Sequence, residues 1–531
     1  MANLLIKGIF VVLGVLLYLQ HVRKRTKLNL PPGPKPIPIL GNIMDFPPKG
    51  MPEYKHWLKH KDLYGPVSSV TVMGQTMVII HDRQAVQELL ETGAKKTSGR
   101  PHTEFGNRLC GYGIFMIGRQ LDDAFRWHRR LIHQQVGSKS VVSLYHGMMA
   151  MEVQRFLARV QREPENLLER FQSLTGAIML KTIYGYSIEQ EKDDDLIILV
   201  EKMMTNLSLA FIPLAWMVDI IPGLRYLPSS LPWMNFKKTA REFSRITHQV
   251  VEAPFLFTQR QMAGLTARPS YVARLLEESR DKGEERSDEE TEAIKITAAG
   301  LFGGGTDTTA SNLSSFVLSM ACFPEVQRKA QQEIDDVVGP DRLPCFDDRD
   351  KMPYMEGVIM EALRCLPNGP MGFTHTATEA MTYGGYDIPK GAHLMPAVWW
   401  LAHDPQVYRD PDEFDPERYS WPRNEPDPRP LVFGFGRRVC PGQWLADSTL
   451  FLVLSQILAV FSIRKAIDEK GSEIDIKLEG RPGMVTHPVN CPFQIRPRNA
   501  QKAHLLQRLQ DENPWEGSDA ESMREILSMS A

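Results

Sequence analysis

Cysteine is scarce in this chain, and its distribution argues against two common kinds of site. Six cysteines occur among 531 residues, and no two of them are spaced as C-x-x-C. Structural zinc sites and disulfide scaffolds both need cysteines in closely spaced sets. The sequence therefore disfavours both, and it suits a reducing compartment.

An excess of one charge sign is also lacking, as are internal repeats and long Gly/Ser linkers. Lysine and arginine number 62 against 64 aspartate and glutamate, a net charge of -2, which gives no reason to expect a nucleic-acid partner. The length would suggest several domains of average size, but large single-domain enzymes are often longer than an average domain. A hydrophobic content of 43% is enough for a large buried core.

One cysteine, Cys440, stands between glycines and arginines directly before an apolar run. The helical spacing of apolar residues in 443–460 predicts a helix that begins just after Cys440. The positive end of that helix and the nearby guanidinium groups would stabilise a thiolate, the form that binds metal. Gly436 and Gly442 would let the backbone approach a bulky group, and Phe433 would keep water from the sulfur. A lone cysteine is otherwise more often a small core side chain.

Residues 433–442 fit the pattern F-x-x-G-x-R-x-C-x-G, in which Arg438 is the arginine. This pattern resembles the haem-thiolate signature of the cytochrome P450 family. The resemblance implies a mainly α-helical fold with a small β region, and haem b bound with Cys440 as the axial ligand of the iron. It also implies haem contacts from Phe433, Gly436 and Arg438, and electrons supplied from NADPH by NADPH-cytochrome P450 reductase.

Residues 291–323 predict a long central helix with a glycine-rich stretch inside it. Each glycine inside a helix lowers helix stability by about 0.8–1 kcal/mol relative to alanine. The missing side chains would in return leave space for a flat macrocycle and dioxygen beside the helix. Residues 304–309 resemble the oxygen-activation motif of the family, which implies that Thr308 orients a proton relay and Asp307 feeds it. The alternative is a glycine-kinked core helix whose threonine is internally satisfied.

Two further positions resemble propionate-binding residues of the family. Phe125 stands where the family typically has a tryptophan, whereas Arg129, four residues later, keeps the usual arginine. A solvated basic helix face is the alternative for Arg129. His375 matches a histidine that often binds a propionate in relatives, although Thr374 and Thr376 replace the usual proline and arginine.

A charge triad is implied by the same resemblance. Glu361 and Arg364 lie three residues apart on a predicted helix and therefore face the same way. Residues 414–419 resemble the P-E-R-F element of the family and contribute Arg418. We expect these three side chains to be structural and to maintain the fold of the cysteine loop.

The N-terminus predicts a membrane anchor in residues 1–22, followed by a basic and proline-rich hinge in 23–42. The apolar run is short for a membrane-spanning helix, but it can span the bilayer if the Lys7 side chain reaches the interface. No small-residue cleavage site of a signal peptide follows it. We therefore expect a single-pass anchor in the endoplasmic reticulum membrane and a cytoplasmic catalytic domain in 43–498. Residues 499–531 predict a polar peripheral extension, with disorder left open.

These features predict a monooxygenase that uses O2 to hydroxylate or otherwise oxidise a small hydrophobic substrate. Residues 128–134 and the region of Phe433 resemble fungal microsomal members of secondary metabolism. Two alternatives are a haem-thiolate isomerase or dehydratase, which would more often lack the Asp307–Thr308 pair, and a non-catalytic haem-binding membrane protein. The sequence does not identify the substrate, because segments far apart along the chain would form the pocket.

Overall fold

The computed structural model describes residues 28–189, 192–231, 233–281 and 286–529. The predicted anchor lies outside the described residues, as does the start of the hinge. The chain forms two compact units. The smaller unit holds the described residues up to Pro101 together with Thr374–Ala397 and Phe435–Arg437, and the larger unit holds the rest.

The smaller unit contains a four-stranded sheet in the order β1-β2-β6-β3. The alternating and β-branched residues on both sides of Gly74 predict a hairpin, which the antiparallel pairing of β1 and β2 confirms. The φ of +94° at Gly74 suits glycine at this turn. β2 pairs parallel with β6, and β4 pairs with β5 in a separate two-stranded sheet. The elements of this unit are η1 (Ile43–Asp45), α2 (Glu53–Tyr64), β1 (Val67–Val72), β2 (Gln75–Ile80), α3 (Arg83–Val86), η2 (Gln87–Thr92), α4 (Ala94–Thr97), β3 (His375–Thr376), β4 (Met381–Tyr383), β5 (Tyr386–Ile388) and β6 (His393–Pro396).

The described part of the proline-rich segment is bound to the smaller unit instead of standing apart as a spacer. Ser69 on β1 donates its backbone N–H to the carbonyl of Pro32 over 2.8 Å and its hydroxyl to that of Pro31 over 2.6 Å. A Cβ on Gly33 would collide with the Ser69 carbonyl. The smaller unit thus includes residues before 43, because Pro31 and Pro32 accept hydrogen bonds at the edge strand β1.

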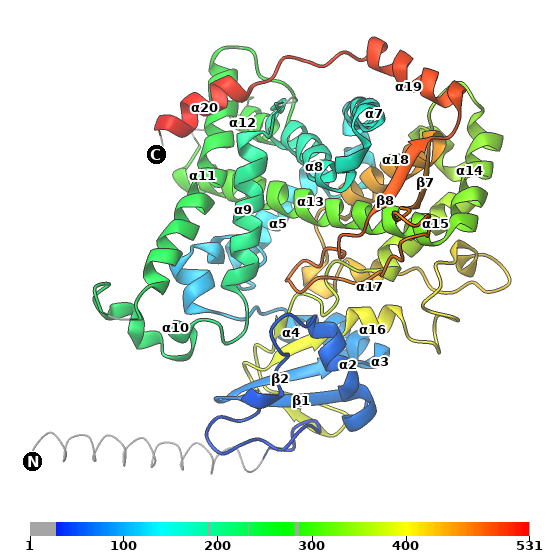
Figure 1. The fold of residues 1–531 in the computed structure, drawn as a ribbon. Helices are drawn as coiled ribbons and strands as arrows, with labels where there is room; N and C mark the ends of the chain where they lie inside the picture. The colour runs from blue at the N-terminus through cyan, green and yellow to red at the C-terminus, as the bar shows by residue number, and fades with distance from the viewer. Residues whose placement is uncertain (1–27, 190–191, 232, 282–285, 530–531) are drawn as a thin grey trace, which may run out of the picture. The chain divides into compact units, whose positions relative to one another are not determined.

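The long central helix predicted for the larger unit is confirmed as α13 (Asp288–Cys322). Ser287 and Glu290 form a reciprocal capping box at its start. Most of its length is buried on all sides, and it packs against α8 (Leu167–Tyr184) and α18 (Gln443–Val460), as Figure 1 shows at the centre of the larger unit. The other elements of this unit are η3 (Glu104–Leu109), η4 (Tyr112–Ile114), α5 (Asp123–Val136), α6 (Lys139–Val142), η5 (Ser143–Tyr145), α7 (His146–Arg162), η6 (Pro164–Asn166), α9 (Asp195–Ala210), α10 (Met217–Ile220), η7 (Pro222–Tyr226), α11 (Phe236–Ala263), α12 (Tyr271–Asp281), α14 (Pro324–Val338), η8 (Phe346–Lys351), α15 (Pro353–Cys365), α16 (Val398–Ala402), η9 (Pro416–Tyr419), α17 (Arg429–Val432), β7 (Phe461–Lys465), β8 (Phe493–Pro497), α19 (Ala500–Glu512) and α20 (Ala520–Met529).

The helix predicted after Cys440 is confirmed as α18, with the expected bounds. Among the described residues, α18 alone is long and apolar enough to cross a membrane by length and composition. Because 83% of it is buried inside the fold, we interpret it as the core helix of the larger unit. The mainly helical fold with small β regions is therefore as predicted.

The C-terminal extension is ordered over residues 499–529, so the disorder left open by its polar composition does not occur there. α19 packs along α7, and α20 packs against α9 and α11, the arrangement seen along the upper edge of Figure 1. Between the two helices, Glu516 lies 2.9 Å from Lys181 Nζ and 3.4 Å from Arg155 Nη2. Both cations are almost fully buried and also pair with Glu152. Polar residues of the extension thus face polar partners, which hydrophobic patterning cannot reveal.

We expect Glu516→Gln to lower the free energy of unfolding by about 1–3 kcal/mol, because Arg155 and Lys181 would then share a single buried carboxylate. Urea unfolding of the purified protein measures this change. Glu525→Gln is the matched control, since that carboxylate is exposed on α20. Equal stability of the two variants would contradict the structural role of the extension.

Candidate functional site

Cys440 lies in a tight loop at the N-terminus of α18. Its backbone N–H donates to the carbonyl of Phe433 over 2.7 Å. Gly434, inside the loop, has a φ of +86°, in the region that favours glycine. Gly442 is the N-cap residue of α18, and the space that a Cβ would occupy there is open. The loop therefore places the sulfur beside the positive end of the helix, as the sequence predicts.

Burial raises the pKa of the Cys440 thiol. A hydrogen bond from the Gly442 backbone N–H and the positive charge of Arg129 both act in the opposite direction. Burial is the largest of these effects, so the helix end and the arginine alone do not favour the thiolate. A metal ion coordinated by the sulfur would lower the pKa of the thiol further.

Arg129 projects from α5 toward the cysteine loop. Its Nη1 donates to the carbonyl of Val439, the residue before Cys440. Its side chain forms no ion pair with any carboxylate that the structure describes, and burial lowers its pKa while Cys440 raises it. A half-buried cation beside the cysteine differs from the solvated basic face that was the alternative.

Arg438 is buried beside Phe125. Its Nη1 and Nη2 donate to the carbonyls of Met116 and Arg119 over 2.9 and 2.7 Å. Its guanidinium carbon lies 4.2 Å from the centroid of the Phe125 ring, a cation–π contact. Burial, together with the charge of Arg129, lowers the pKa of Arg438 to about 10. Phe125 thus covers the arginine with an apolar face and, unlike a tryptophan, contributes no hydrogen-bond donor.

The glycines of α13 have two different roles. A Cβ on Gly303 would lie 2.8 Å from Met203 Cε on α9, and one on Gly305 would lie 2.5 Å from Met179 Sδ on α8. These two glycines allow the helices to pack closely. Only Gly304 faces open space, with no atom within 4 Å of its missing Cβ. The prediction that the glycine stretch makes room for a ligand is therefore wrong for Gly303 and Gly305, and stays a prediction for Gly304.

Asp307 and Thr308 lie on α13 one turn after the open position at Gly304. The Thr308 hydroxyl donates to the Gly304 carbonyl over 2.7 Å. Asp307 Oδ1 lies 2.9 Å from Nε2 of His487, and the Asn368 amide donates to the Thr308 carbonyl over 2.8 Å. Both side chains are half-buried, so the acid and the hydroxyl keep access to the open side of the helix.

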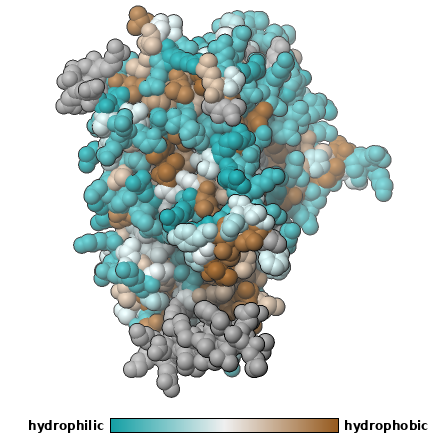
Figure 2. Space-filling view, turned by 90° about the vertical axis from the view of Figure 1, so that its left-hand side faces the viewer, coloured by the Kyte–Doolittle hydropathy of each residue, from teal (hydrophilic) through white to brown (hydrophobic). Residues whose placement is uncertain are grey.

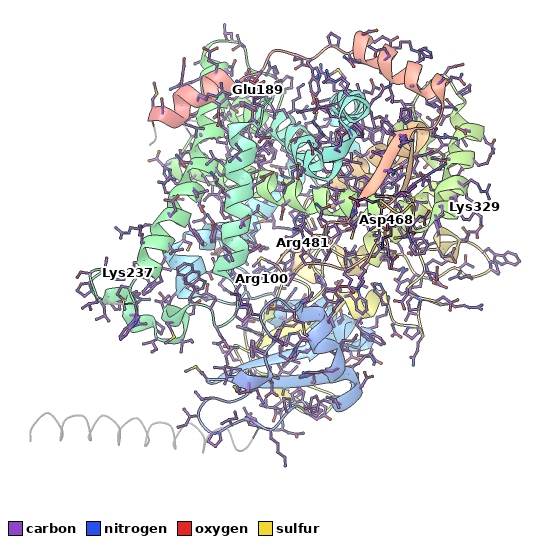
Figure 3. The ribbon with its side chains drawn as sticks, viewed as in Figure 1. Arg100, Glu189, Lys237, Lys329, Asp468 and Arg481 are labelled. Carbon is purple, nitrogen blue, oxygen red and sulfur yellow. The ribbon has the colours of Figure 1, made fainter. Side chains whose placement is uncertain are left out.

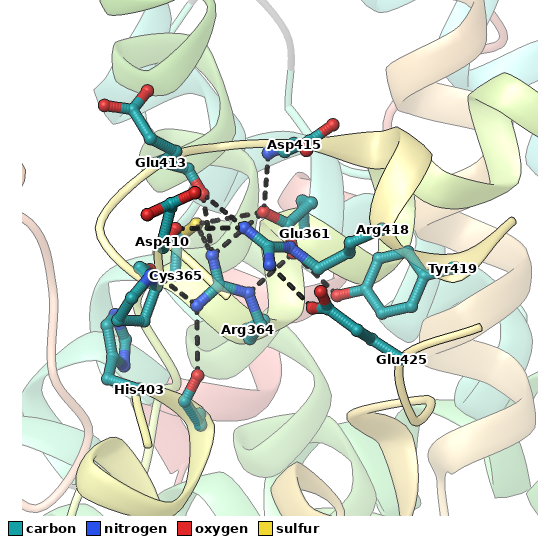
Figure 4. Close-up of polar contacts among 12 residues, drawn as sticks. Glu361, Arg364, Cys365, His403, Asp410, Glu413, Asp415, Arg418, Tyr419 and Glu425 are labelled. Atoms are coloured by element: carbon teal, nitrogen blue, oxygen red, sulfur yellow. Dashed lines mark hydrogen bonds and ion pairs between the residues drawn. The ribbon is translucent and has the colours of Figure 1, made fainter. Parts of the chain in front are cut away.

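The predicted charge triad is present and fully buried (Figure 4). Glu361 on α15 lies 2.6 Å from Arg364 Nε and 3.1 Å from Arg418 Nε, and all three side chains are 0% exposed. Two further residues complete the network: the Tyr419 hydroxyl donates to Glu361 over 2.6 Å, and Arg418 donates to Glu425 over 2.7 Å. The arginines also donate to backbone carbonyls of the segment between α16 and η9. The triad therefore holds an irregular stretch of chain to α15.

Two predicted site residues belong to the smaller unit. His375 is buried on β3, with Nδ1 2.9 Å from the carbonyl of Thr97. Arg100, labelled in Figure 3, donates from the same unit to the carbonyl of the residue before His375 over 2.8 Å. Gly436 packs against the carbonyl of Leu90 and leaves no space for a side chain. The binding roles of His375 and Gly436 stay predictions.

Sequence reasoning assigned no role to several residues that the structure brings into these networks. His487 and Asn368 reach α13 from distant segments, and Glu425 neutralises Arg418. Tyr419 is the last residue of the 414–419 motif, and this position was the one signal available. The other three contacts cross more than 50 residues or join irregular segments, which leaves no periodic pattern in the sequence.

Comparisons with known proteins identify relatives over almost the whole chain. The model of the cytochrome P450 family matches residues 31–493. The chain is 45% identical to cytochrome P450 monooxygenase CLM2 of Gibberella zeae, over 98% of this chain and 99% of the relative. It is 44% identical to the multifunctional cytochrome P450 monooxygenase af510 of Aspergillus fumigatus, over 97% of each chain. It is 36% identical to an O-methylsterigmatocystin oxidoreductase of Aspergillus flavus, over 95% of this chain and 94% of the relative.

We expect Glu361→Gln to lower the free energy of unfolding by about 3–5 kcal/mol, because two fully buried arginines lose a shared negative charge. Chemical denaturation followed by circular dichroism measures the loss. The control is Lys329→Gln, at the position labelled in Figure 3: this lysine pairs with Glu417 over 3.0 Å on the surface, and its removal should cost less than about 1 kcal/mol. Similar losses in both variants would refute a structural role for the triad.

Proposed function

The chain belongs to the cytochrome P450 family and is a monooxygenase of that family, and from this premise we propose how its own residues serve the reaction. Membership implies a haem iron. In our proposal Cys440 is the axial ligand of haem b, and NADPH-cytochrome P450 reductase supplies the electrons. One oxygen atom of O2 is inserted into a small hydrophobic substrate, and the other leaves as water.

The environment of Cys440 is the observation that carries this proposal. Its loop places the half-buried sulfur at the N-terminus of α18, where the Gly442 N–H and Arg129 both lower the pKa of the thiol against the effect of burial. A metal cation bound there would lower that pKa further. Open space at Gly442 and at Gly304 leaves room for a flat group near the cysteine loop and along α13. Arg129, which pairs with no described carboxylate, is available to bind a propionate, and Arg438 adds a second buried cation beside it.

When bound, haem supplies the iron chemistry that activates O2, with the thiolate as electron donor to the iron. The residues of the chain exclude water and hold or pass protons. Phe433, packed against the core, helps to keep water from the sulfur. Thr308 places a hydroxyl beside the open position of α13, and Asp307 places a carboxylate next to it. These two groups can hold and pass protons to the reacting oxygen.

A membrane location is part of the same proposal. Large apolar side chains are exposed between α9 and α11, among them Met217 at 55%, Tyr226 at 75% and Trp233 at 89%. The face that carries α10 and α11 is mostly hydrophilic with apolar side chains between (Figure 2). Such exposed aromatic and aliphatic groups suit contact with a lipid surface. Together with the apolar N-terminal sequence, they support attachment to the endoplasmic reticulum membrane.

The substrate class is proposed from the relatives. Those compared here come from fungi, and one is named for oxidation of O-methylsterigmatocystin. We propose that this chain acts in fungal secondary metabolism on a hydrophobic compound. The predicted contacts of His375 with a haem propionate and of Gly436 with the haem are kept as part of the proposal.

We expect Cys440→Ala to abolish both the haem-thiolate signature in the carbon monoxide difference spectrum and NADPH-dependent turnover, because no other described residue would supply the axial sulfur. Cys345→Ala is the control, since that cysteine is exposed and should leave the spectrum unchanged. Retention of the thiolate spectrum in Cys440→Ala would overturn the ligand assignment.

Substrate and reaction can be identified by comparing metabolites of the organism with those of a strain that lacks the gene. We expect a compound to accumulate in the deletion strain and a product heavier by one oxygen to disappear from it. A lost product with the same formula as the accumulated compound would indicate an isomerase instead. No metabolite change would indicate a non-catalytic haem protein.

A further inference from the structure

The Asp307 carboxylate has a specific partner on a loop that lies far away along the sequence. Nε2 of His487 lies 2.9 Å from Asp307 Oδ1. An ionised carboxylate can only accept hydrogen bonds, so Nε2 carries the proton and donates it to the contact. Oδ2 accepts no hydrogen bond from any residue in the described part of the chain. The histidine therefore fixes one oxygen of the acid and leaves the other available.

The loop that carries His487 is closed at its neck. Backbone hydrogen bonds join Arg481 to His487 over 2.7 Å and Val489 to Glu479 over 2.8 Å, and Arg481 Nε donates to the Pro488 carbonyl over 3.0 Å. Figure 3 labels Arg481 at this neck. The sequence predicts a hairpin tip in residues 483–488, and the structure forms an irregular loop closed by one bridge, between Gly480 and Pro488. The backbone on both sides of His487 is thus restrained.

The same loop is attached to α13 at a second point. The Ser311 hydroxyl donates to the Thr486 carbonyl over 2.6 Å, and the Thr486 N–H donates to the Asn368 carbonyl over 2.8 Å. Asp307 and Ser311 are four residues apart and lie on one face of the helix. Consecutive loop residues, Thr486 and His487, therefore contact consecutive turns of α13. Two attachments determine where the imidazole lies, whereas one would allow it to rotate away.

Other carboxylates lie near Asp307. Glu201 on α9 is close enough for its pKa, already raised by burial, to be raised further by the charges of Asp193, Asp307 and Glu169. These carboxylates repel one another. His487, with 29% of its side chain exposed against 13% for Asp307, is the one imidazole among the described residues in contact with Asp307. It opposes the repulsion and holds the acid toward its own side of α13.

We propose that His487 is a positioning residue for the Asp307–Thr308 relay: by donating to Asp307 Oδ1 it orients the carboxylate so that Oδ2 serves the proton path beside Thr308. This inference rests on the proposed function. In this proposal, efficient proton delivery depends on a residue outside α13, on the loop that Thr486 attaches to that helix. His487 touches neither substrate nor cofactor in this role and acts only through Asp307.

The test is the fate of O2 in substrate-free turnover with NADPH and reductase. O2 takes two electrons and two protons to give hydrogen peroxide, or four of each to give two molecules of water. Poor proton delivery favours peroxide. We expect His487→Leu to raise the ratio of peroxide to water about fivefold, the size of effect that loss of one typical hydrogen bond produces, and to approach the ratio of Thr308→Ala. His487→Gln, which keeps an N–H donor, should restore most of the wild-type ratio.

A second measurement does not depend on turnover. In protein labelled with ¹³C-histidine, the imidazole resonance that His487→Gln removes should shift in Asp307→Asn. Arg481→Gln is the control for loop integrity, because it removes only the side-chain bond to Pro488 and keeps both backbone bonds of the neck and the contact of His487 with Asp307. Its peroxide ratio should therefore equal that of the wild type. An unchanged ratio in His487→Leu, an unshifted resonance, or an equal effect of Arg481→Gln would each overturn the proposal.

Failure of this inference is distinguishable from failure of the proposed function. The wild-type carbon monoxide spectrum and wild-type NADPH consumption test the function. Only differences between variants, at an unchanged melting temperature, test His487. His487→Leu added to Asp307→Asn should have no further effect, and an additional rise in peroxide would show that the histidine acts by another route and refute the proposal.

Discussion

The proposed chemistry sets one constraint: the sulfur of Cys440 has to carry a negative charge although its surroundings oppose this. Burial raises the pKa of the thiol, and the side chain of Cys440 keeps part of its exposure. The N-terminus of α18 and Arg129 reduce this cost without cancelling it. A metal cation bound to the sulfur would lower the pKa of the thiol further, which suits the role proposed for Cys440. The loop geometry, the buried arginines and the helix end all serve this one atom.

A second set of buried charges has a structural role and holds an irregular segment to α15. Glu361 holds two arginines in a fully buried cluster, and these in turn hold the carbonyls of an irregular segment. Such a cluster contributes little net stability compared with a hydrophobic core. Its value is specificity: a stretch without helix or strand has few other ways to satisfy its backbone groups in one conformation. Tyr419 and Glu425 complete the balance of charge and hydrogen bonds.

α13 combines packing and chemistry on adjacent residues. Gly303 and Gly305 bring α9 and α8 close, whereas Gly304, between them, points into open space. The helix period turns each successive residue by about 100°, so three neighbouring glycines meet three different environments. The same period places Gly304, Asp307, Thr308 and Ser311 toward the open side and the loop of His487. Close packing on two faces thus supports a polar path on the third.

The sequence by itself determined the elements whose pattern is local. Apolar spacing predicts α13 and α18, turn residues predict the β1–β2 hairpin, and ten residues around Cys440 carry the family signature. Only the tertiary structure decided the contacts between residues that are distant in the chain. Three features arise only when α13, α8, α9 and the C-terminal segments pack together. They are the contact of His487 with Asp307, the pairing of Glu516 with Lys181, and the different surroundings of the three glycines of α13. Polar contacts between distant segments leave no periodicity in the sequence, because each needs only one suitable residue at one place in space.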